Sequence, residues 1–151
     1  MTFTSNTIQL DYTGGGVNIT LGSGVNYTID ITTESGGVAA AFGAGAHIGD
    51  VTLDVTSGGI AFTLTNDAVI IGNATFDFTT HSGGIAFTID VPIGFGASVS
   101  ASTVSGGIDI DAVGWVSLGD NDYQTVNYDD SARILDITVS AYSGGISGNL
   151  V

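Results

Sequence analysis

Large apolar residues recur at every second position along several short stretches of this chain. Residues 60–64 read Ile-Ala-Phe-Thr-Leu, residues 85–89 read Ile-Ala-Phe-Thr-Ile, and residues 17–21 follow the same pattern. Successive side chains of a β-strand point to opposite faces, so this period predicts strands with one face in a core and the other in water. The pattern therefore predicts an all-β protein made of many short strands.

A glycine motif separates these stretches. Ser-Gly-Gly followed by Val or Ile occurs in five places, and Gly-Gly-Gly-Val is a degenerate sixth copy. The copies begin at Gly14, Ser35, Ser57, Ser82, Ser105 and Ser143. Glycine adopts positive φ without penalty and lets two backbones approach closely, which suits a sharp corner. One repeat is therefore predicted to be a strand, a Gly-Gly corner and a second strand.

These motifs are compatible with two architectures. If each motif were a hairpin turn, the chain would form an antiparallel β-sandwich. The nearly constant repeat length, with apolar residues in matching positions, favours a β-solenoid-like stack in which equivalent strands lie side by side. About six two-strand repeats, spaced ~4.8 Å apart, would form a stack roughly 30 Å tall. We expect residues 1–151 to form a single β-repeat domain of this kind.

The longest repeat carries an insertion near residues 114–130. It contains the only tryptophan of the chain, Trp115, together with Tyr123 and Tyr128. Insertions in repeat proteins form loops on one face, which is often a binding face. The three aromatic residues are candidates for a platform that binds glycan or protein, or alternatively for a cap over the open end of the core.

An apolar-Asp-apolar-Thr motif precedes most of the corners. Its acids are Asp11, Asp30, Asp54, Asp77 and Asp136. They lie three, five or seven residues before the corner motif, and the odd offsets keep them on one side of the strand. Stacked in a ladder, these carboxylates would repel one another or recruit cations, and calcium accepts such oxygen ligands. The alternative is a solvated polar column.

Calcium is the one cofactor that these acids suggest. The candidate ligands are Asp30, Asp54 and Asp77 of the ladder, with Asp120 and Asp122 of the insertion. The last two belong to a Gly-Asp-Asn-Asp segment that resembles the opening of a calcium loop but lacks the later Gly and Glu. A plain turn is the alternative for that segment.

The charge balance excludes several classes of partner. The formal net charge is −14, and Arg133 is the only Lys or Arg of the chain. No basic patch can be built, so we expect no nucleic-acid partner and no attraction to anionic membranes. There is no cysteine and no apolar run long enough for a membrane span, and from the residues at Met1 we expect no signal peptide there. The low charge density, the Ser/Thr richness and the lack of Lys and Cys suggest an extracellular or cell-surface protein.

No catalytic residue is predicted. His47 and His81 are the only histidines and lie far apart in the sequence, and no Gly-x-Ser-x-Gly nucleophile motif occurs. Paired acids such as Asp109 and Asp111 could in principle perform glycoside chemistry. A polysaccharide-acting β-helix enzyme therefore stays open as the weakest alternative, and we expect a protein that is not an enzyme.

Three segments of the chain resemble a known family. Residues 56–64, 81–105 and 143–146 are similar to the toast-rack domains, adhesin-like β-repeat domains of bacteria and archaea that repeat a strand, Ser-Gly-(Gly or Asp)-Ile and strand unit. The resemblance implies an all-β, solenoid-like fold at the cell surface and no catalytic residues. The long insertion and the near absence of basic residues depart from the family pattern.

The ends of the chain suggest self-association. Residues 7–13 resemble the strand before a corner, and residues 143–146 are a corner near the C-terminus, so we expect complementary half-repeats with unprotected strand edges. Such subunits would join end to end, or exchange a terminal strand, to form a filament. The predicted assembly residues are Phe3, Ile8, Leu10, Ile146 and Leu150.

Three functional hypotheses follow. The first is a non-catalytic extracellular structural protein that self-assembles end to end into a filament or surface layer, with itself as partner. The second is an adhesin-like module that binds glycan or a surface protein. The third is the polysaccharide-acting enzyme.

Overall fold

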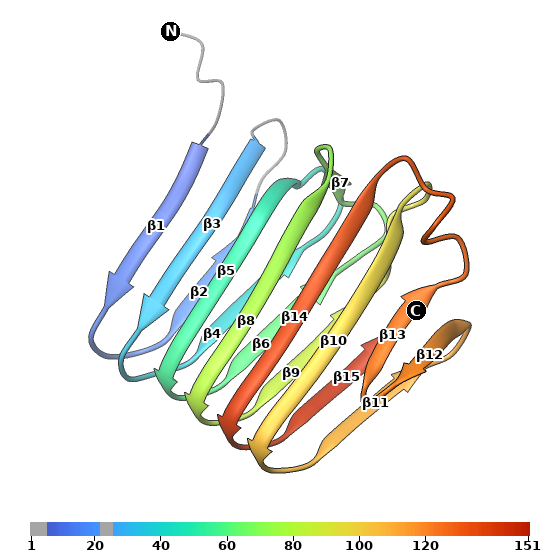
Figure 1. Cartoon of the computed structure of the whole chain (residues 1–151). Coiled ribbons are helices and arrows are strands. Elements are labelled where there is room, and N and C mark those ends of the chain that lie inside the picture. Colours follow the sequence, from blue (N-terminus) through green and yellow to red (C-terminus); the bar gives the residue numbers. More distant parts are fainter. Residues whose placement is uncertain (1–5, 22–25) are drawn as a thin grey trace, which may run out of the picture.

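The computed structural model describes residues 6–21 and 26–151, and all regular secondary structure within them is β-strand (Figure 1). One sheet contains, in spatial order, β1 (Asn6–Tyr12), β3 (Asn26–Thr33), β5 (His47–Ser57), β8 (Ala74–Ser82), β14 (Ile134–Ser143), β10 (Gly96–Ser105), β13 (Asp122–Thr125) and β12 (Trp115–Gly119), with β7 (Val69–Ile70) beside β5. The other contains β2 (Val17–Thr20), β4 (Val38–Phe42), β6 (Ile60–Leu64), β9 (Ile85–Ile89), β15 (Ile146–Leu150) and β11 (Ile108–Ala112).

The two sheets face each other and are joined by the glycine corners. We call one strand of the larger sheet, its corner and the following strand of the smaller sheet a rung. The rungs, numbered along the chain, are β1–β2, β3–β4, β5–β6, β8–β9, β10–β11 and β14–β15. Equivalent strands of neighbouring rungs pair in parallel and in register, as for β6 and β9. The predicted β-solenoid-like stack of about six rungs is confirmed, and the antiparallel sandwich is wrong.

The spatial order of the rungs differs from their order in the sequence. In the larger sheet β14 lies between β8 and β10, and in the smaller sheet β15 lies between β9 and β11. The sixth rung is therefore inserted between the fourth and the fifth (Figure 1). The corner hydrogen bonds follow the same path, since Gly83 N donates to Ser143 O and Gly144 N donates to Ser105 O. The expectation of a half-repeat at an exposed C-terminal end is wrong.

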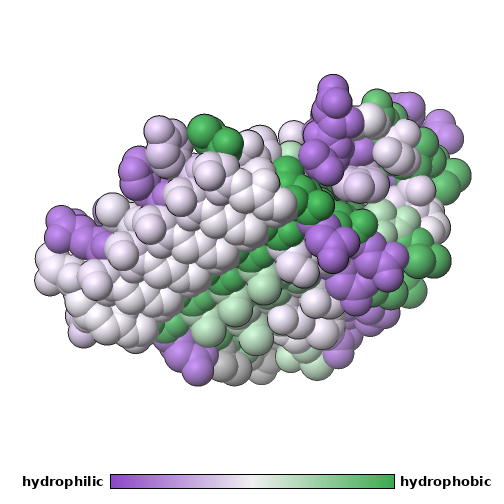
Figure 2. All heavy atoms as spheres, turned by 90° about the horizontal axis from the view of Figure 1, so that it is seen from below, coloured by the Kyte–Doolittle hydropathy of each residue, from purple (hydrophilic) through white to green (hydrophobic). Residues whose placement is uncertain are grey.

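The glycine corners are required by close contact between rungs. The first glycine of each corner has positive φ, from 97° at Gly15 to 157° at Gly106. A β-carbon at Gly58 would overlap the carbonyl oxygen of Gly36 in the next rung, and the other inner corners are equally tight. This combination of positive φ and backbone contact excludes any larger residue. Figure 2 shows these corners as a broad, nearly colourless band bordered by a hydrophobic stripe.

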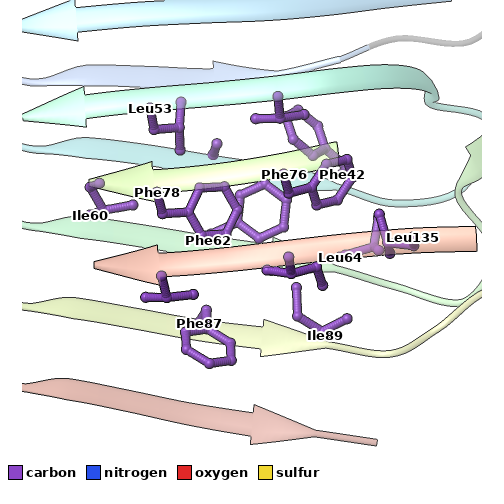
Figure 3. Close-up of a cluster of buried hydrophobic side chains, with 14 of the residues drawn as sticks. Phe42, Leu53, Ile60, Phe62, Leu64, Phe76, Phe78, Phe87, Ile89 and Leu135 are labelled. Atoms are coloured by element: carbon purple, nitrogen blue, oxygen red, sulfur yellow. The ribbon is translucent and has the colours of Figure 1, made fainter. Parts of the chain in front are cut away.

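The core fills the space between the two sheets. The inward positions of both sheets carry large apolar side chains, and the centre is aromatic (Figure 3). The ring centroids of Phe62 and Phe78 are 4.5 Å apart, and those of Phe62 and Phe76 are 5.4 Å apart. Aromatic pairs in such tilted or edge-on arrangements add to the stabilisation from burial. The alternation read from the sequence therefore corresponds to the buried face of each strand.

Two buried threonines tie the larger sheet to the corners. Among the described residues, Thr33 and Thr80 are the buried polar ones. The hydroxyl of Thr80 donates to the carbonyl oxygen of Gly58 at 3.0 Å, and that of Thr33 points to the carbonyl oxygen of Ser35 at 3.4 Å. A buried hydroxyl needs a partner, and these partners are the carbonyl groups exposed by the sharp turn.

The two ends of the stack differ. At the first rung, no described strand pairs with the outer edge of β1 or β2. At the fifth rung, β12 and β13 form an antiparallel hairpin, and β13 pairs antiparallel with β10. The insertion near residues 114–130 therefore covers part of the edge that the larger sheet would otherwise expose.

Candidate functional site

Of the two interpretations of the apolar-Asp-apolar-Thr motif, the ladder is not formed, because the acids are staggered. Asp30 and Asp77 share one column of the larger sheet, but Thr52 lies between them. Asp11 and Asp54 share a second column, separated by Thr32. Asp136 lies in a third column, between Thr75 and Ser98. Each carboxylate thus has a threonine, serine or glutamine as its direct cross-strand neighbour.

The stagger lowers the repulsion that a ladder would create. Two acids of one column are two strand spacings apart, roughly 10 Å, which exceeds the screening length of about 8 Å at physiological salt. Within the described ranges, no group of three or more acidic or histidine side chains is arranged to hold a metal ion. The structure does not bring Asp30, Asp54 and Asp77 together with Asp120 and Asp122, so calcium binding stays an untested prediction.

The Gly-Asp-Asn-Asp segment is the turn of the β12–β13 hairpin. Asp120 has φ 49° and Asn121 has φ 66°, and the two residues link the strands directly. Positive φ at both central residues is the geometry of a two-residue type I′ hairpin turn, which Asn and Asp tolerate. The segment therefore has a structural reason for its composition that requires no ion.

The aromatic residues of the insertion do not form one exposed platform. Trp115 on β12 and Tyr123 on β13 are half-buried and pack against the core. They cover the end of the core beside the fifth rung. The packing of these two residues favours the interpretation as a cap.

Tyr128 takes part in a polar network instead. Its hydroxyl donates to Asp136 Oδ1 at 2.8 Å, and Ser98 Oγ donates to the same oxygen at 2.7 Å. The hydrogen bond to the Asp136 carboxylate favours the protonated phenol, so the pKa of Tyr128 is raised above 10.0, and partial burial acts in the same direction. The network attaches the segment after β13 to the sixth rung.

The hairpin end carries a cluster of exposed apolar side chains that the sequence interpretation missed. Val113, Val116, Leu118 and Val126 are between 40% and 78% exposed. We call these four residues the hairpin patch. In Figure 2 hydrophobic and hydrophilic atoms are mixed at the end of the stack that bears the hairpin. A signal was available, because residues 115–118 place Val and Leu on the side of the strand opposite Trp115.

Acidic residues lie on the elements that carry the hairpin patch and on the neighbouring β11. The acids of β11, of the hairpin turn and of the following segment are Asp109, Asp111, Asp120, Asp122, Asp129 and Asp130. The single arginine, Arg133, lies over the ring of Phe95 at 4.4 Å and is engaged there. This end of the stack therefore exposes apolar and acidic side chains together, a combination found on protein-binding surfaces.

The predicted assembly residues fall in three different places. Ile8 and Leu10 lie on β1 at the open end of the stack, and Leu10 is 40% exposed. Phe3 lies outside the described residues. Ile146 and Leu150 are 2% and 1% exposed on β15, which has a paired strand on each side. The prediction that these two residues lie on an exposed end is wrong, because their rung is inside the stack.

We find no helix in residues 6–21 and 26–151 that has the length and apolar character required to cross a membrane. No protein-family model matches the chain, and no curated protein matches it. A solved structure from Clostridium sporogenes, described as a "putative cell adhesion protein", is similar to it with a TM-score of 0.80. The alignment covers 97% of this chain and 93% of that one, at 13% sequence identity. The chain therefore shares its fold with that protein.

Proposed function

We propose that this chain is a non-catalytic, adhesin-like module of the cell surface that binds a protein through its hairpin end. The observation that carries the proposal is the hairpin patch, four exposed apolar side chains at the end of the stack where six acids also lie on β11, the hairpin turn and the following segment. The fold shared with the Clostridium sporogenes protein and the resemblance to toast-rack domains favour the same class of function.

The chemistry of this end favours a basic protein surface over a glycan. Valine and leucine side chains gain free energy when an apolar partner covers them, whereas sugars are commonly bound by exposed aromatic rings. The surrounding carboxylates would attract lysine and arginine side chains and raise the association rate. We therefore expect a partner with an apolar centre and a positive rim.

The position of the acids supports a non-catalytic role. The buried polar residues of the described chain are threonines, so its carboxyl groups lie at the surface or only half-buried. A glycosidase needs one carboxyl group kept protonated near neutral pH by an apolar or charged environment. Surface acids spaced by threonine do not offer that environment.

Binding of beads coated with the full chain to immobilised matrix proteins and to a glycan array tests the proposal. We expect binding to basic proteins that falls at least tenfold, roughly 1.4 kcal/mol, in a Val116→Ser/Leu118→Ser variant. The control is Val69→Ser/Ile71→Ser, which removes two apolar residues that are each 42% exposed at and beside β7. Absence of protein binding, or an equal loss in both variants, would contradict the proposal, and selective glycan binding would favour the alternative ligand.

Self-assembly into a filament or surface layer is a second proposal, favoured by the open end of the stack. Leu10 and Tyr12 are 40% and 47% exposed there, beside the outer edges of β1 and β2, with which no strand of residues 6–21 and 26–151 pairs. At the other end, β13 pairs with β10 in the antiparallel direction. A parallel strand of a second molecule therefore cannot pair with that edge of β10. Negative-stain microscopy tests this proposal, and isolated particles at high concentration would contradict it.

A further inference from the structure

The sixth rung fills a slot whose walls come from earlier parts of the chain. β14 pairs with β8 and β10, and β15 pairs with β9 and β11. All four wall strands precede residue 113 in the sequence. Without residues 134–150, these four strands would each have an unpaired edge facing the slot, and unpaired edges favour pairing with another strand.

One side-chain contact makes the slot selective. In the smaller sheet, Phe87 of the fourth rung, Gly148 of the sixth and Ile110 of the fifth occupy one inward column. The Phe87 ring extends over Gly148 and occupies the space that a β-carbon there would need. If the fifth rung closed directly on the fourth in the same register, Ile110 would meet this ring. The slot therefore matches a rung with glycine at this position, and only the sixth rung provides it.

The segment that leads to the sixth rung is not itself part of a sheet. Residues 126–133 connect β13 to β14. No strand ladder holds them; their bonds are turn and side-chain hydrogen bonds, including Tyr128 OH to Asp136 Oδ1 at 2.8 Å, Asn127 Nδ2 to Phe95 O at 3.0 Å and Gly96 N to Arg133 O at 2.9 Å. A connection of this kind can lead a terminal element into its own molecule or into a neighbouring one.

From these three observations we propose that residues 134–150 form an exchangeable rung, and that the slot between the fourth and fifth rungs also accepts this rung from a second copy of the chain. Reciprocal exchange gives a closed dimer, and exchange in one direction gives an open chain of molecules. The proposal does not depend on the proposed adhesive function.

Paired single-cysteine variants test the exchange, because the chain has no native cysteine. Ala86 and Ser147 are exposed register partners on β9 and β15. Neighbouring strands lie about 4.8 Å apart, within the Cα separation that a disulfide bridges. Full-length Ala86→Cys and Ser147→Cys chains with tags of different size are mixed, refolded together at high concentration, and oxidised. Circular dichroism verifies that both variants fold.

We expect a disulfide-linked heterodimer that becomes more abundant with protein concentration. The control replaces Ala86→Cys by Ala61→Cys, because Ala61 lies in the same column but the fourth rung separates it from Ser147. We expect roughly tenfold less heterodimer with the control pair, since its cysteines are too far apart in an exchanged dimer. Equal heterodimer in both mixtures, or none in either at any concentration, would overturn the proposal whatever the binding assays show.

Discussion

The ring of Phe87 on β9 lies in the space that a side chain at Gly148 on β15 would occupy. The two residues are register partners on neighbouring strands, and both are buried. Because glycine leaves this space free, the large ring of the fourth rung fits directly against the sixth rung. This contact gives a local physical reason for the order in which the rungs are stacked.

Gly148→Ala is therefore expected to destabilise the protein. Its β-carbon would force the buried Phe87 ring to move, and overpacking of this kind costs about 1–3 kcal/mol. Urea unfolding measures the loss, and Phe87→Leu in the same chain should recover part of it. The control is Gly107→Ala, where nothing lies within 4 Å of the added carbon. A Gly148→Ala protein as stable as the parent would show that the contact does not constrain the stack.

Gly58→Ala is expected to be more damaging, because the obstacle is backbone. Gly58 has φ 144°, and its new β-carbon would overlap the carbonyl oxygen of Gly36. Strain and overlap together should cost about 3 kcal/mol or more, enough to reduce the yield of folded protein. Gly14→Ala, with nothing within 4 Å, is the matched control. Expression yield and thermal melting distinguish the two variants, and similar values would refute the close-contact explanation of the corners.

Thr80→Val tests the hydrogen bond between the core and the corner. The substitution keeps the shape of the side chain but removes the donor to Gly58 O, leaving a buried carbonyl group with one partner fewer. We expect a loss of about 1–2 kcal/mol in the free energy of unfolding. Thr63→Val, at an exposed position on β6, should change stability by less than about 0.5 kcal/mol. An equal effect at both positions would mean that the bond contributes nothing specific.

Thr52→Asp tests the importance of the staggered acids. It would place a third carboxylate in one column, directly between Asp30 and Asp77. Like charges directly opposite one another are destabilising, so we expect a loss of about 1 kcal/mol at neutral pH and low salt. Lowering the pH or raising the salt concentration should restore stability. A calcium salt should restore it more than a sodium salt at the same ionic strength. Thr52→Asn is the neutral control, and a pH-independent loss would point to a steric cause instead.

Tyr128 should contribute to stability in a manner that depends on alkaline pH. Its pKa is raised in the folded state by the hydrogen bond to Asp136, so folding favours the protonated phenol. The contribution is therefore fully present below pH 10.0 and is lost as the pH rises through the higher folded-state pKa. Tyr128→Phe should lower stability by about 0.5 kcal/mol at neutral pH and flatten its decline above pH 10. Unfolding measured between pH 7 and 11 would show parallel curves if the bond has no effect.

Much of the fold was predictable because its signals are local. Each Ser-Gly-Gly corner depends on the φ angles and close backbone contacts of its two glycines. Each strand depends on the alternation of apolar and polar residues along the chain. The offsets of Asp30 and Asp54 from their corners were also visible in the sequence. Their stagger becomes evident only when the corners are aligned, because a difference of two residues moves an acid to the next column.

The sequence by itself determined the repeat: its strands, its corners, which side of each strand is buried and how many rungs there are. Tertiary structure alone decided the order of the rungs and the burial of Ile146 and Leu150 inside the stack. The physical reason is that parallel backbone pairing is nearly the same for any two rungs. The choice among neighbours therefore depends on side-chain fit between distant residues, such as Phe87 and Gly148, and on the path of the connecting hairpin.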